Sequence, residues 1–451
     1  MAFNTITFLF FFFPITLLLF FLTPKKYRSY TLLVASFVFY CWGDTKNLIF
    51  ILFSALFSYL TALEIDILKQ ENKEKENKIV FITAIVVHVA LLAFFKYTGL
   101  LSMPLGISFY TFSVLSYIFD VYYGKCHAER NILDYLLYVS FFPKVISGPI
   151  VQFHDFKAQL VHRIVTRKGV VEGTQLFMLG LFKKVLLADQ LGMAYSAFHQ
   201  TNTVIGSYLT VISYGLQLYF DFSGYSDMAI GLSSIFGFHF GKNFDEPYTS
   251  HSISEFWRRW HISLGAWFRD YVYIPLGGNR VSKIKFLRNI LIVWLLTGIW
   301  HGASWNFIIW GLLFGILLII EKLWLNKILD KLPNIIKRIY VLFIVMISFI
   351  IFNANTMNTA WHNIIGLFGV NKEPFINTYT IYYIKSYLPI LIVAIIASTP
   401  ICKNIIEKLK KNNLINNIIN ILEPFYIIIL LLLVTAYLID SSYNPFLYFR
   451  F

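Results

Sequence analysis

Long apolar runs separated by short polar turns fill most of this chain. A helix needs about 20 mostly apolar residues to cross the hydrocarbon core of a bilayer. The number of runs predicts about ten to twelve true crossings, and the shorter runs are expected to be tilted or re-entrant. The runs cover residues 5–22, 30–43, 46–63, 79–96, 105–122, 134–151, 174–194, 205–222, 288–304, 305–320, 338–353, 380–399 and 425–440.

Composition supports the same class of protein. Of the 451 residues, 57% are hydrophobic and only 14% are charged, which excludes an ordinary soluble domain. We expect an all-α polytopic membrane protein in which residues 1–451 form one transmembrane domain. The first run lacks a basic n-region and a cleavage site, so it is expected to remain as a span. Residues 239–320 hold nearly all the unusual polar chemistry, and the catalytic core is expected to cover about 205–320.

The formal net charge is +14, but its distribution argues against nucleic acid as a partner. The basic residues lie in short loops between apolar runs, as cytoplasmic loops facing anionic lipid headgroups do. The pattern places the N-terminus outside and the end of the first span inside. The basic residues concerned are Lys25, Lys26, Arg28, Arg163, Arg167, Lys168, Arg280, Lys283, Lys285 and Arg288.

Residues 252–280, "SISEFWRRWHISLGAWFRDYVYIPLGGNR", have helical periodicity with tryptophans on one face and arginines on the other. This pattern predicts one amphipathic helix that lies along the interface or plugs a polar cavity. His261 falls at the edge of the apolar face, where it can be an interfacial anchor or a functional group. The apolar positions are Ile253, Phe256, Trp257, Trp260, Leu264, Trp267, Phe268 and Tyr271.

The run 289–320 contains no Asp, Glu, Lys or Arg, yet it holds a histidine in "GIWHG". As a single helix, its 32 residues would extend about 48 Å. Since the hydrocarbon core is only ~30 Å thick, a break is predicted near Gly302–Asn306, beside His301. Gly298 and Gly302 form a G-x-x-x-G pattern that permits close helix approach.

Several roles are open for His301. It can be a core histidine with one hydrogen bond, a metal ligand, a proton relay or a general base. No second metal-ligand residue lies nearby in the sequence, so no metal is expected. Most predicted spans also lack the acids of a proton relay. A general base fits best, because imidazole titrates near neutral pH and can take a proton from a hydroxyl.

Asp221 and Asp227 lie in an otherwise apolar run. We interpret them mainly as a polar kink whose acids cap a broken helix or pair with Arg258, Arg259 or Arg269, and secondarily as catalytic groups.

These stretches together resemble the membrane-bound O-acyltransferase family, in its bacterial branch that acetylates alginate and peptidoglycan. The matching motifs are "GISFYTF", "FFPKVISGPI", "YFDFSGYSDMAIGL", "KNFDEPY", the whole of 252–280 and "GIWHGASWNFIIWG". The resemblance implies a ring of transmembrane helices around a thin central catalytic site, with funnels from both faces. It places the essential histidine of the family on His301 and a second histidine on His261.

The resemblance also implies acetyl transfer from cytoplasmic acetyl-CoA toward an exported polysaccharide, in a bacterial cytoplasmic membrane. His261, Asn306 or backbone N–H groups near Gly302 can stabilise the oxyanion. The basic residues Arg258, Arg259, Arg280 and Lys283 either attract the donor phosphates or only set the topology. An extracytoplasmic acetyltransferase, or a partner resembling SGNH hydrolases, is expected to complete the reaction.

Two other functions stay open on the sequence. One is transfer of D-alanine or another acyl group to teichoic acid or lipid, and the other is transport of acyl groups or glycans. A transporter predicts more intramembrane charges and an internal repeat, and the sequence has neither.

The chain ends in "NPFLYFRF", an apolar terminus that is expected to dock rather than fray. It can act as an interfacial aromatic anchor beside Arg450. Alternatively, it inserts into the funnel so that Tyr448 accepts the acetyl group and passes it on. A phenyl ester is a good acyl donor because phenol leaves with a pKa near 10. The ending also resembles the aromatic C-terminal motif of a small partner protein found beside D-alanine-transferring relatives.

Overall fold

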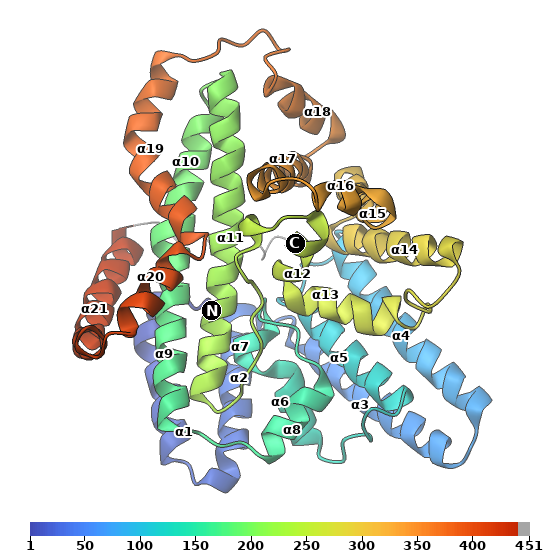
Figure 1. Cartoon of the computed structure of the whole chain (residues 1–451). Helices are drawn as coiled ribbons and strands as arrows, with labels where there is room; N and C mark the ends of the chain where they lie inside the picture. The colour runs from blue at the N-terminus through green and yellow to red at the C-terminus, as the bar shows by residue number, and fades with distance from the viewer. Residues whose placement is uncertain (441–451) are drawn as a thin grey trace. The chain divides into compact units, whose positions relative to one another are not determined.

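The computed structural model describes residues 1–440, and within them every regular element is a helix (Figure 1). The predicted all-α class is therefore confirmed. Within this part of the chain, seven helical segments are long and apolar enough to cross a membrane, and 8–22 is a shorter apolar helix. The seven are Leu48–Gln70, Glu74–Tyr97, Lys283–His301, Trp305–Leu329, Asn334–Asn353, Thr378–Ala397 and Asn413–Asp440.

The described chain divides into two compact units. The first contains Met1–Leu181 and Tyr225–Gly241, and the second contains Phe182–Gly224 and residues 242–440. The helices of the first unit are α1 (Phe13–Leu22), α2 (Arg28–Asp44), α3 (Leu48–Gln70), α4 (Glu74–Tyr97), α5 (Ile107–Tyr122), α6 (Ile132–Ser140), α7 (Phe142–Val145), α8 (Phe153–Val161) and nearly all of α9 (Arg167–Phe182).

The second unit holds most of the predicted site. Its π-helical segments are η3 (Lys183–Ala188), η5 (Arg269–Tyr273) and η6 (Glu321–Leu325), and it has a 3-10 turn, η4 (Pro247–Thr249). Its helices are α10 (Asp189–His199), the first part of α11 (Val204–Ile235), α12 (Ile253–Arg259), α13 (Ile262–Phe268), α14 (Lys283–His301), α15 (Trp305–Ile320), α16 (Asn326–Leu329), α17 (Asn334–Asn353), α18 (Met357–Gly366), α19 (Thr378–Ala397), α20 (Ile401–Lys410) and α21 (Asn413–Asp440).

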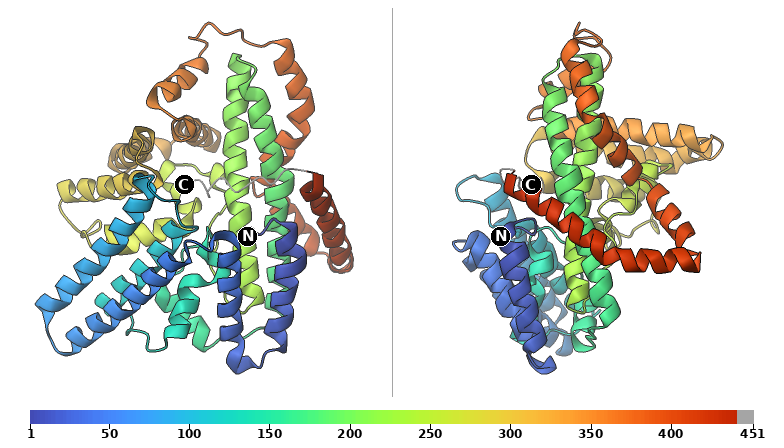
Figure 2. Two further views of the ribbon diagram at one scale, coloured as in Figure 1. Left: turned by 180° about the vertical axis from the view of Figure 1, so that it is seen from behind. Right: turned by 90° about the vertical axis from the view of Figure 1, so that its left-hand side faces the viewer.

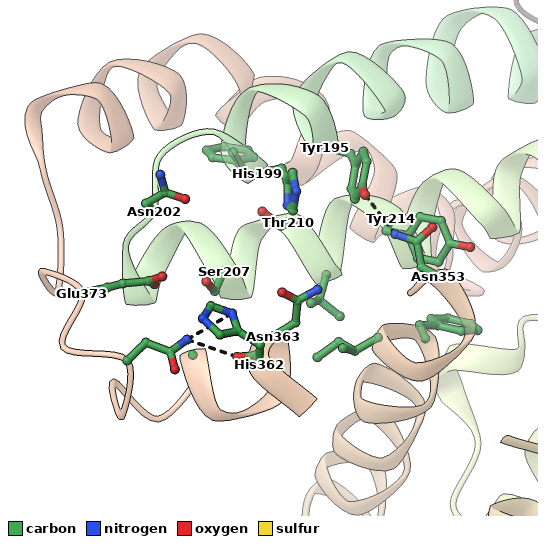
Figure 3. A pocket seen from close by; sticks show the side chains of 16 residues that line it. Tyr195, His199, Asn202, Ser207, Thr210, Tyr214, Asn353, His362, Asn363 and Glu373 are labelled. Carbon is green, nitrogen blue, oxygen red and sulfur yellow. Dashed lines mark hydrogen bonds between the residues drawn. The ribbon is translucent and has the colours of Figure 1, made fainter. Parts of the chain in front are cut away.

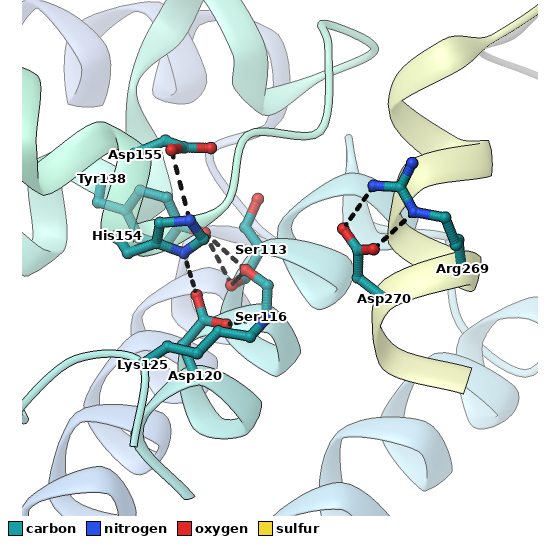
Figure 4. A network of polar contacts seen from close by, with 9 residues as sticks. All are labelled: Ser113, Ser116, Asp120, Lys125, Tyr138, His154, Asp155, Arg269 and Asp270. Carbon is teal, nitrogen blue, oxygen red and sulfur yellow. Dashed lines mark hydrogen bonds and ion pairs between the residues drawn. The ribbon is translucent and has the colours of Figure 1, made fainter. Parts of the chain in front are cut away.

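The predicted span 134–151 is wrong. Helix α6 ends at Ser140, Phe141 leaves helical geometry, and Pro143 lies in the first turn of the four-residue helix α7. Proline lacks an N–H, and in a helix interior its ring clashes with the carbonyl four residues earlier, so the apolar run cannot continue as one helix. Instead, this segment joins a polar network in the first unit through Tyr138, whose hydroxyl lies 2.9 Å from Ser116 Oγ. There His154 Nδ1 lies 2.9 Å from a carboxylate oxygen of Asp120, which also pairs with Lys125 (Figure 4).

The predicted polar kink around Asp221 and Asp227 is also wrong, because α11 runs without a break from Val204 to Ile235. A long helix tolerates isolated acids when neighbouring side chains compensate them, so no break is needed there.

Helices α14 and α15 form an antiparallel hairpin in the second unit (Figures 1 and 2). Glycines allow the close contact: a Cβ at Gly298 would lie 2.5 Å from the carbonyl oxygen of Phe307, and one at Gly311 would lie 2.4 Å from that of Trp294. The hairpin turns at Gly302–Ser304, where the sequence predicts a break. A single helix is avoided, and the turn brings His301 to the tip of the hairpin.

Candidate active site

His301 is the last residue of α14, directly before the extended Gly302. It is buried, with a relative exposure of 5%, even though its side chain is titratable. The C-terminal end of a helix carries partial negative charge from unpaired carbonyls. That charge favours the imidazolium form of a histidine at this position.

Aromatic rings surround the imidazole of His301. Ring centroids lie at 4.6 Å for Trp300, 5.1 Å for Trp310, 5.0 Å for Phe352 and 6.1 Å for Phe307. These rings come from α14, α15 and α17, so three helices position the histidine. Such an enclosure limits water, which strengthens electrostatic and proton-transfer interactions at the ring.

Asn306 lies in the first turn of α15 and is 2% exposed. Its amide nitrogen donates to the carbonyls of Ala354 (2.8 Å) and Ile351 (3.4 Å), and its oxygen accepts from the Ser304 hydroxyl. The amide hydrogens are thus directed at the C-terminal end of α17. This geometry favours a structural role for Asn306, which ties α15 to α17, over the oxyanion role suggested by the sequence.

The single amphipathic helix expected over 252–280 is wrong. The segment forms α12, α13 and η5, with a break between Arg259 and Ile262. At the break, His261 has φ 46° and ψ 54°, in the left-handed region. Backbone hydrogen bonds with the segment that precedes α12 fix this turn. Asp245 N–H donates to the Arg259 carbonyl, and Ile262 N–H donates to the Asn243 carbonyl, both at 2.9 Å.

The hydrogen bonds around His261 define its tautomer. Asn243 Oδ1 accepts from the backbone N–H of Ser263 (3.1 Å) and from its hydroxyl (2.9 Å), so this atom must be an oxygen. His261 Nδ1 lies 3.2 Å from the same oxygen and must donate to it. In the neutral ring the lone pair is then on Nε2, which accepts a proton or hydrogen bond and does not donate one.

Burial keeps this ring neutral. His261 is 3% exposed, its ring lies 4.7 Å from that of Phe222, and desolvation lowers the pKa of His261 to about 3. Since the imidazole is neutral at physiological pH and Nε2 carries its lone pair, the oxyanion-donor role is disfavoured. The geometry instead fits an acceptor for a donor group of a substrate.

A cavity of about 430 Å³ lies between the α12–α13 segment and the α14–α15 hairpin. Its size is within the range of small-molecule sites. Its apolar walls include Trp257, Ile290, Val293 and Trp294, and its polar lining includes His261 and Thr297, which lies one helical turn before His301. Trp310 links the two regions, because its ring lies 5.1 Å from that of His301 and 5.6 Å from that of Trp257.

Three cationic residues line this cavity: Arg258, Arg269 and Lys322. Arg269 forms a bidentate pair with Asp270, with N···O distances of 2.7 and 3.1 Å (Figure 4). For Arg258, the structure gives no ion pair within residues 1–440. A cavity with this charge on one part of its lining and indole rings on another suits an elongated ligand with an anionic end and an apolar stem.

The other basic residues suggested by the sequence lie elsewhere. Arg259 pairs with Glu255 at 2.7 Å and does not line the cavity. Arg280 lies in the turn before α14 and Lys283 is the first residue of α14; both are exposed, and neither lines the cavity.

The arginine partners predicted for Asp221 are wrong. Asp221 is 1% exposed and pairs at 2.7 Å with Lys184, which also contacts Asp189 at 2.8 Å. Lys184 and Asp221 come from η3 and α11, so the contact is tertiary and ties these elements together. Asp227 is half-buried in α11.

Several site residues were missed in the sequence. Lys322 is the second residue after the long apolar run 289–320 and could have been noticed as a cation near its end. Asn243 was noted only as part of the motif "KNFDEPY". Its contact with His261 forms only when the segment between α11 and α12 is folded. Glu321 is fully buried and accepts hydrogen bonds from Ile253 N–H (2.6 Å) and Ser254 N–H (2.8 Å), which caps α12. Tyr448, the predicted acyl relay, lies outside the described residues.

Comparison with known proteins identifies relatives over most of the chain. The model of the MBOAT, membrane-bound O-acyltransferase family matches residues 38–360. The probable alginate O-acetylase AlgI of Azotobacter vinelandii is 39% identical over 392 residues, which covers 82% of this chain and 78% of the relative. The peptidoglycan O-acetyltransferase of Helicobacter pylori is 33% identical over 426 residues, 82% of this chain and 80% of the relative. The teichoic acid D-alanyltransferase of Bacillus subtilis is 27% identical over 326 residues, 66% and 81% respectively.

Proposed function

The chain belongs to the membrane-bound O-acyltransferase family, and from this premise we propose that it transfers an acetyl group from acetyl-CoA to a hydroxyl, for O-acetylation of an exported polysaccharide. The chain is a multi-pass membrane acyltransferase. The acetyl donor, the polysaccharide acceptor and a location in the bacterial cytoplasmic membrane are parts of the proposal. The names of its relatives at 39% and 33% identity support acetyl over D-alanyl transfer.

We assign His301 as the general base. Its imidazole takes the proton of the acceptor hydroxyl while the oxygen attacks the thioester carbonyl carbon, which forms the new C–O bond. The carbonyl oxygen becomes an oxyanion. When the oxyanion collapses, the C–S bond breaks, and the imidazolium returns its proton to the CoA thiolate. The products are an ester and free CoA thiol, and general-base help of this kind contributes about 10²–10⁴-fold.

The observation that carries the proposal is the arrangement around Trp310. This ring contacts both the buried His301 and Trp257, a wall of the cation-lined cavity. We propose that the pantetheine arm of acetyl-CoA packs along Trp257 and Trp294. Its phosphates would then lie toward Arg258 and Lys322.

The experiment measures release of CoA thiol against acetyl-CoA concentration with purified protein in lipid vesicles. Replacing Arg258 by Gln or Lys322 by Gln should raise KM about 10-fold each, the effect of one lost charge-assisted contact. Added salt should weaken wild-type donor binding in the same direction.

Arg280→Gln is the matched control, because Arg280 is also basic and near α14 but lies outside the cavity lining. It should leave KM unchanged. Equal effects of Arg258→Gln and Arg280→Gln would mean that these charges act only through topology, and the donor site would be wrong.

The route of the acetyl group after transfer includes two further proposals. An extracytoplasmic acetyltransferase or SGNH-hydrolase-like partner receives it, and Tyr448 relays it. The relay forms an ester between the Tyr448 phenol oxygen and the acetyl carbon, with His301 taking the phenol proton and CoA thiol leaving. The partner hydroxyl then displaces the phenol.

A further inference from the structure

A second recess, separate from the cation-lined cavity, has a mainly polar lining. It has a volume of about 110 Å³ and is built from α10, α11, α17, α18 and the segment before α19 (Figure 3). Its polar lining includes Tyr195, His199, Asn353, His362, Asn363 and Glu373.

Two hydrogen bonds order the walls of this recess. Asn353 Nδ2 donates to the Tyr195 hydroxyl at 2.9 Å, which joins α17 to α10. Asn371 Nδ2 donates to the His362 carbonyl at 3.1 Å, which folds the following loop onto α18. Figure 3 shows both links at the edges of the recess. The side chains of Ser207, Thr210 and Asn363 line the recess between these two links (Figure 3).

The charges of the described helices place this recess on the outer side. Helix α17 begins just after Lys331 and carries Lys337 and Arg338 in its first turns, whereas the recess contacts its other end at Phe349–Asn353, about 22 Å along the axis. Helix α19 likewise runs from the recess toward the lysines of α20. Since basic ends face the cytoplasm, the recess faces the opposite side.

The composition of the lining selects the chemistry of a ligand. Amides and hydroxyls both donate and accept hydrogen bonds, as the hydroxyls of a sugar require. Tyr195 and His199 stack at 5.8 Å, and Tyr214 and Phe349 add further rings on which the apolar face of a sugar can pack. The lining contains no Lys or Arg among the described residues, and Glu373 is its one carboxylate.

We infer that this recess binds a sugar unit of an uncharged glycan on the outer face of the protein. The inference rests on the proposed function, because it takes the ligand to be part of the exported glycan. A polyuronate carries a carboxylate on every sugar and needs guanidinium or ammonium partners, which this lining lacks. The volume is below that of typical small-molecule pockets, so one ring, or part of one, is seated while the rest of the chain runs across the surface.

The test measures oligosaccharide binding to the full-length protein in detergent by isothermal titration calorimetry. The probes are the tetramer of N-acetylglucosamine, which is uncharged, and a mannuronate tetramer of equal length. The uncharged tetramer should bind at least 10-fold more tightly. Asn363→Ala and Tyr195→Phe should each weaken it about 5- to 10-fold, as loss of one hydrogen bond does.

Asn358→Ala is the matched control, because Asn358 is on the same helix, α18, but outside the lining. Its binding should equal that of wild type. Equal or tighter binding of the mannuronate tetramer, no binding of either sugar, or equal losses in Asn358→Ala and Asn363→Ala would overturn the inference.

Thioester cleavage in the same wild-type preparation separates this inference from the proposed function. Cleavage without binding of the uncharged tetramer refutes the recess alone. Binding without any acetyl transfer refutes the proposed activity while the recess stands.

Discussion

Replacing Glu321 by Gln should destabilise the protein and weaken donor binding together. The carboxylate accepts from Ile253 N–H at 2.6 Å, Ser254 N–H at 2.8 Å and the Ser254 hydroxyl at 2.7 Å. An amide of the same shape turns an NH₂ group toward these donors. It therefore loses a charge-assisted hydrogen bond and leaves a buried N–H unsatisfied, a cost of about 2–4 kcal/mol.

Helix α12 contributes Trp257 and Arg258 to the lining of the proposed donor cavity. A loosened cap at its start should therefore raise KM for acetyl-CoA several-fold, as well as lower the unfolding temperature by several degrees. The assays are thermal unfolding followed by tryptophan fluorescence, and thiol release. Glu407→Gln makes the same chemical change on the exposed helix α20 and should alter neither value. An unfolding temperature and a KM equal to those of wild type in Glu321→Gln would refute the role of Glu321 as the cap of α12.

Three further predictions concern His261, Asn306 and Tyr448. Asparagine tolerates the left-handed conformation, so His261→Asn should lower kcat with little loss of stability. His261→Ala should lower kcat and also lose about 1 kcal/mol of stability, because alanine is strained in that conformation. Equal kcat in wild type and His261→Asn would leave His261 with a packing role only. Burial lowers the pKa of His261 to about 3 in the folded protein, whereas the unfolded value is near 6.5. As pH falls from 6.5 toward 3, the unfolded chain binds a proton that the folded protein does not, so the free energy of unfolding declines by about 1.4 kcal/mol per pH unit. Unfolding scans from pH 7 to 5 should therefore show a smaller decline in His261→Asn than in wild type. Asn306→Ala should lower the free energy of unfolding by about 1–3 kcal/mol, through the orphaned carbonyls of α17, and an unchanged unfolding temperature would contradict the tie. Tyr448→Phe keeps the ring and removes the hydroxyl, so glycan acetylation should be lost if Tyr448 is the relay, and full acetylation would leave only the anchor interpretation.

The length of the uncharged run predicted the α14–α15 break, because the cause of the break is local. A 32-residue uncharged run is too long for one crossing, and Gly302 stands where the chain turns. The same kind of pattern failed over 252–280. Trp260 and Leu264 keep helical spacing across the break, and both are buried. The break itself is held by backbone hydrogen bonds from Asn243 and Asp245, which periodicity within the segment cannot reveal.

Pairings between distant residues were also beyond the sequence. Asp221 was assigned arginine partners from nearby motifs, but its partner Lys184 lies 37 positions earlier on η3. Cations are numerous in this chain, and spacing gives no preference among them. The helical spacing did place Arg258 on the polar face of its helix, and Arg258 lines the cavity. That Lys322 lines the same cavity could be seen only in the folded hairpin.

The central claim is that His301 is the base in acetyl transfer. The most direct test is transfer of radiolabelled acetyl from acetyl-CoA to a hydroxyl acceptor by purified His301→Ala in lipid vesicles, with unfolding temperature and vesicle insertion as controls for folding. The claim predicts a loss of at least about 10²-fold in rate in a variant that inserts normally. A well-inserted His301→Ala protein that transfers acetyl at a rate close to wild type would contradict it.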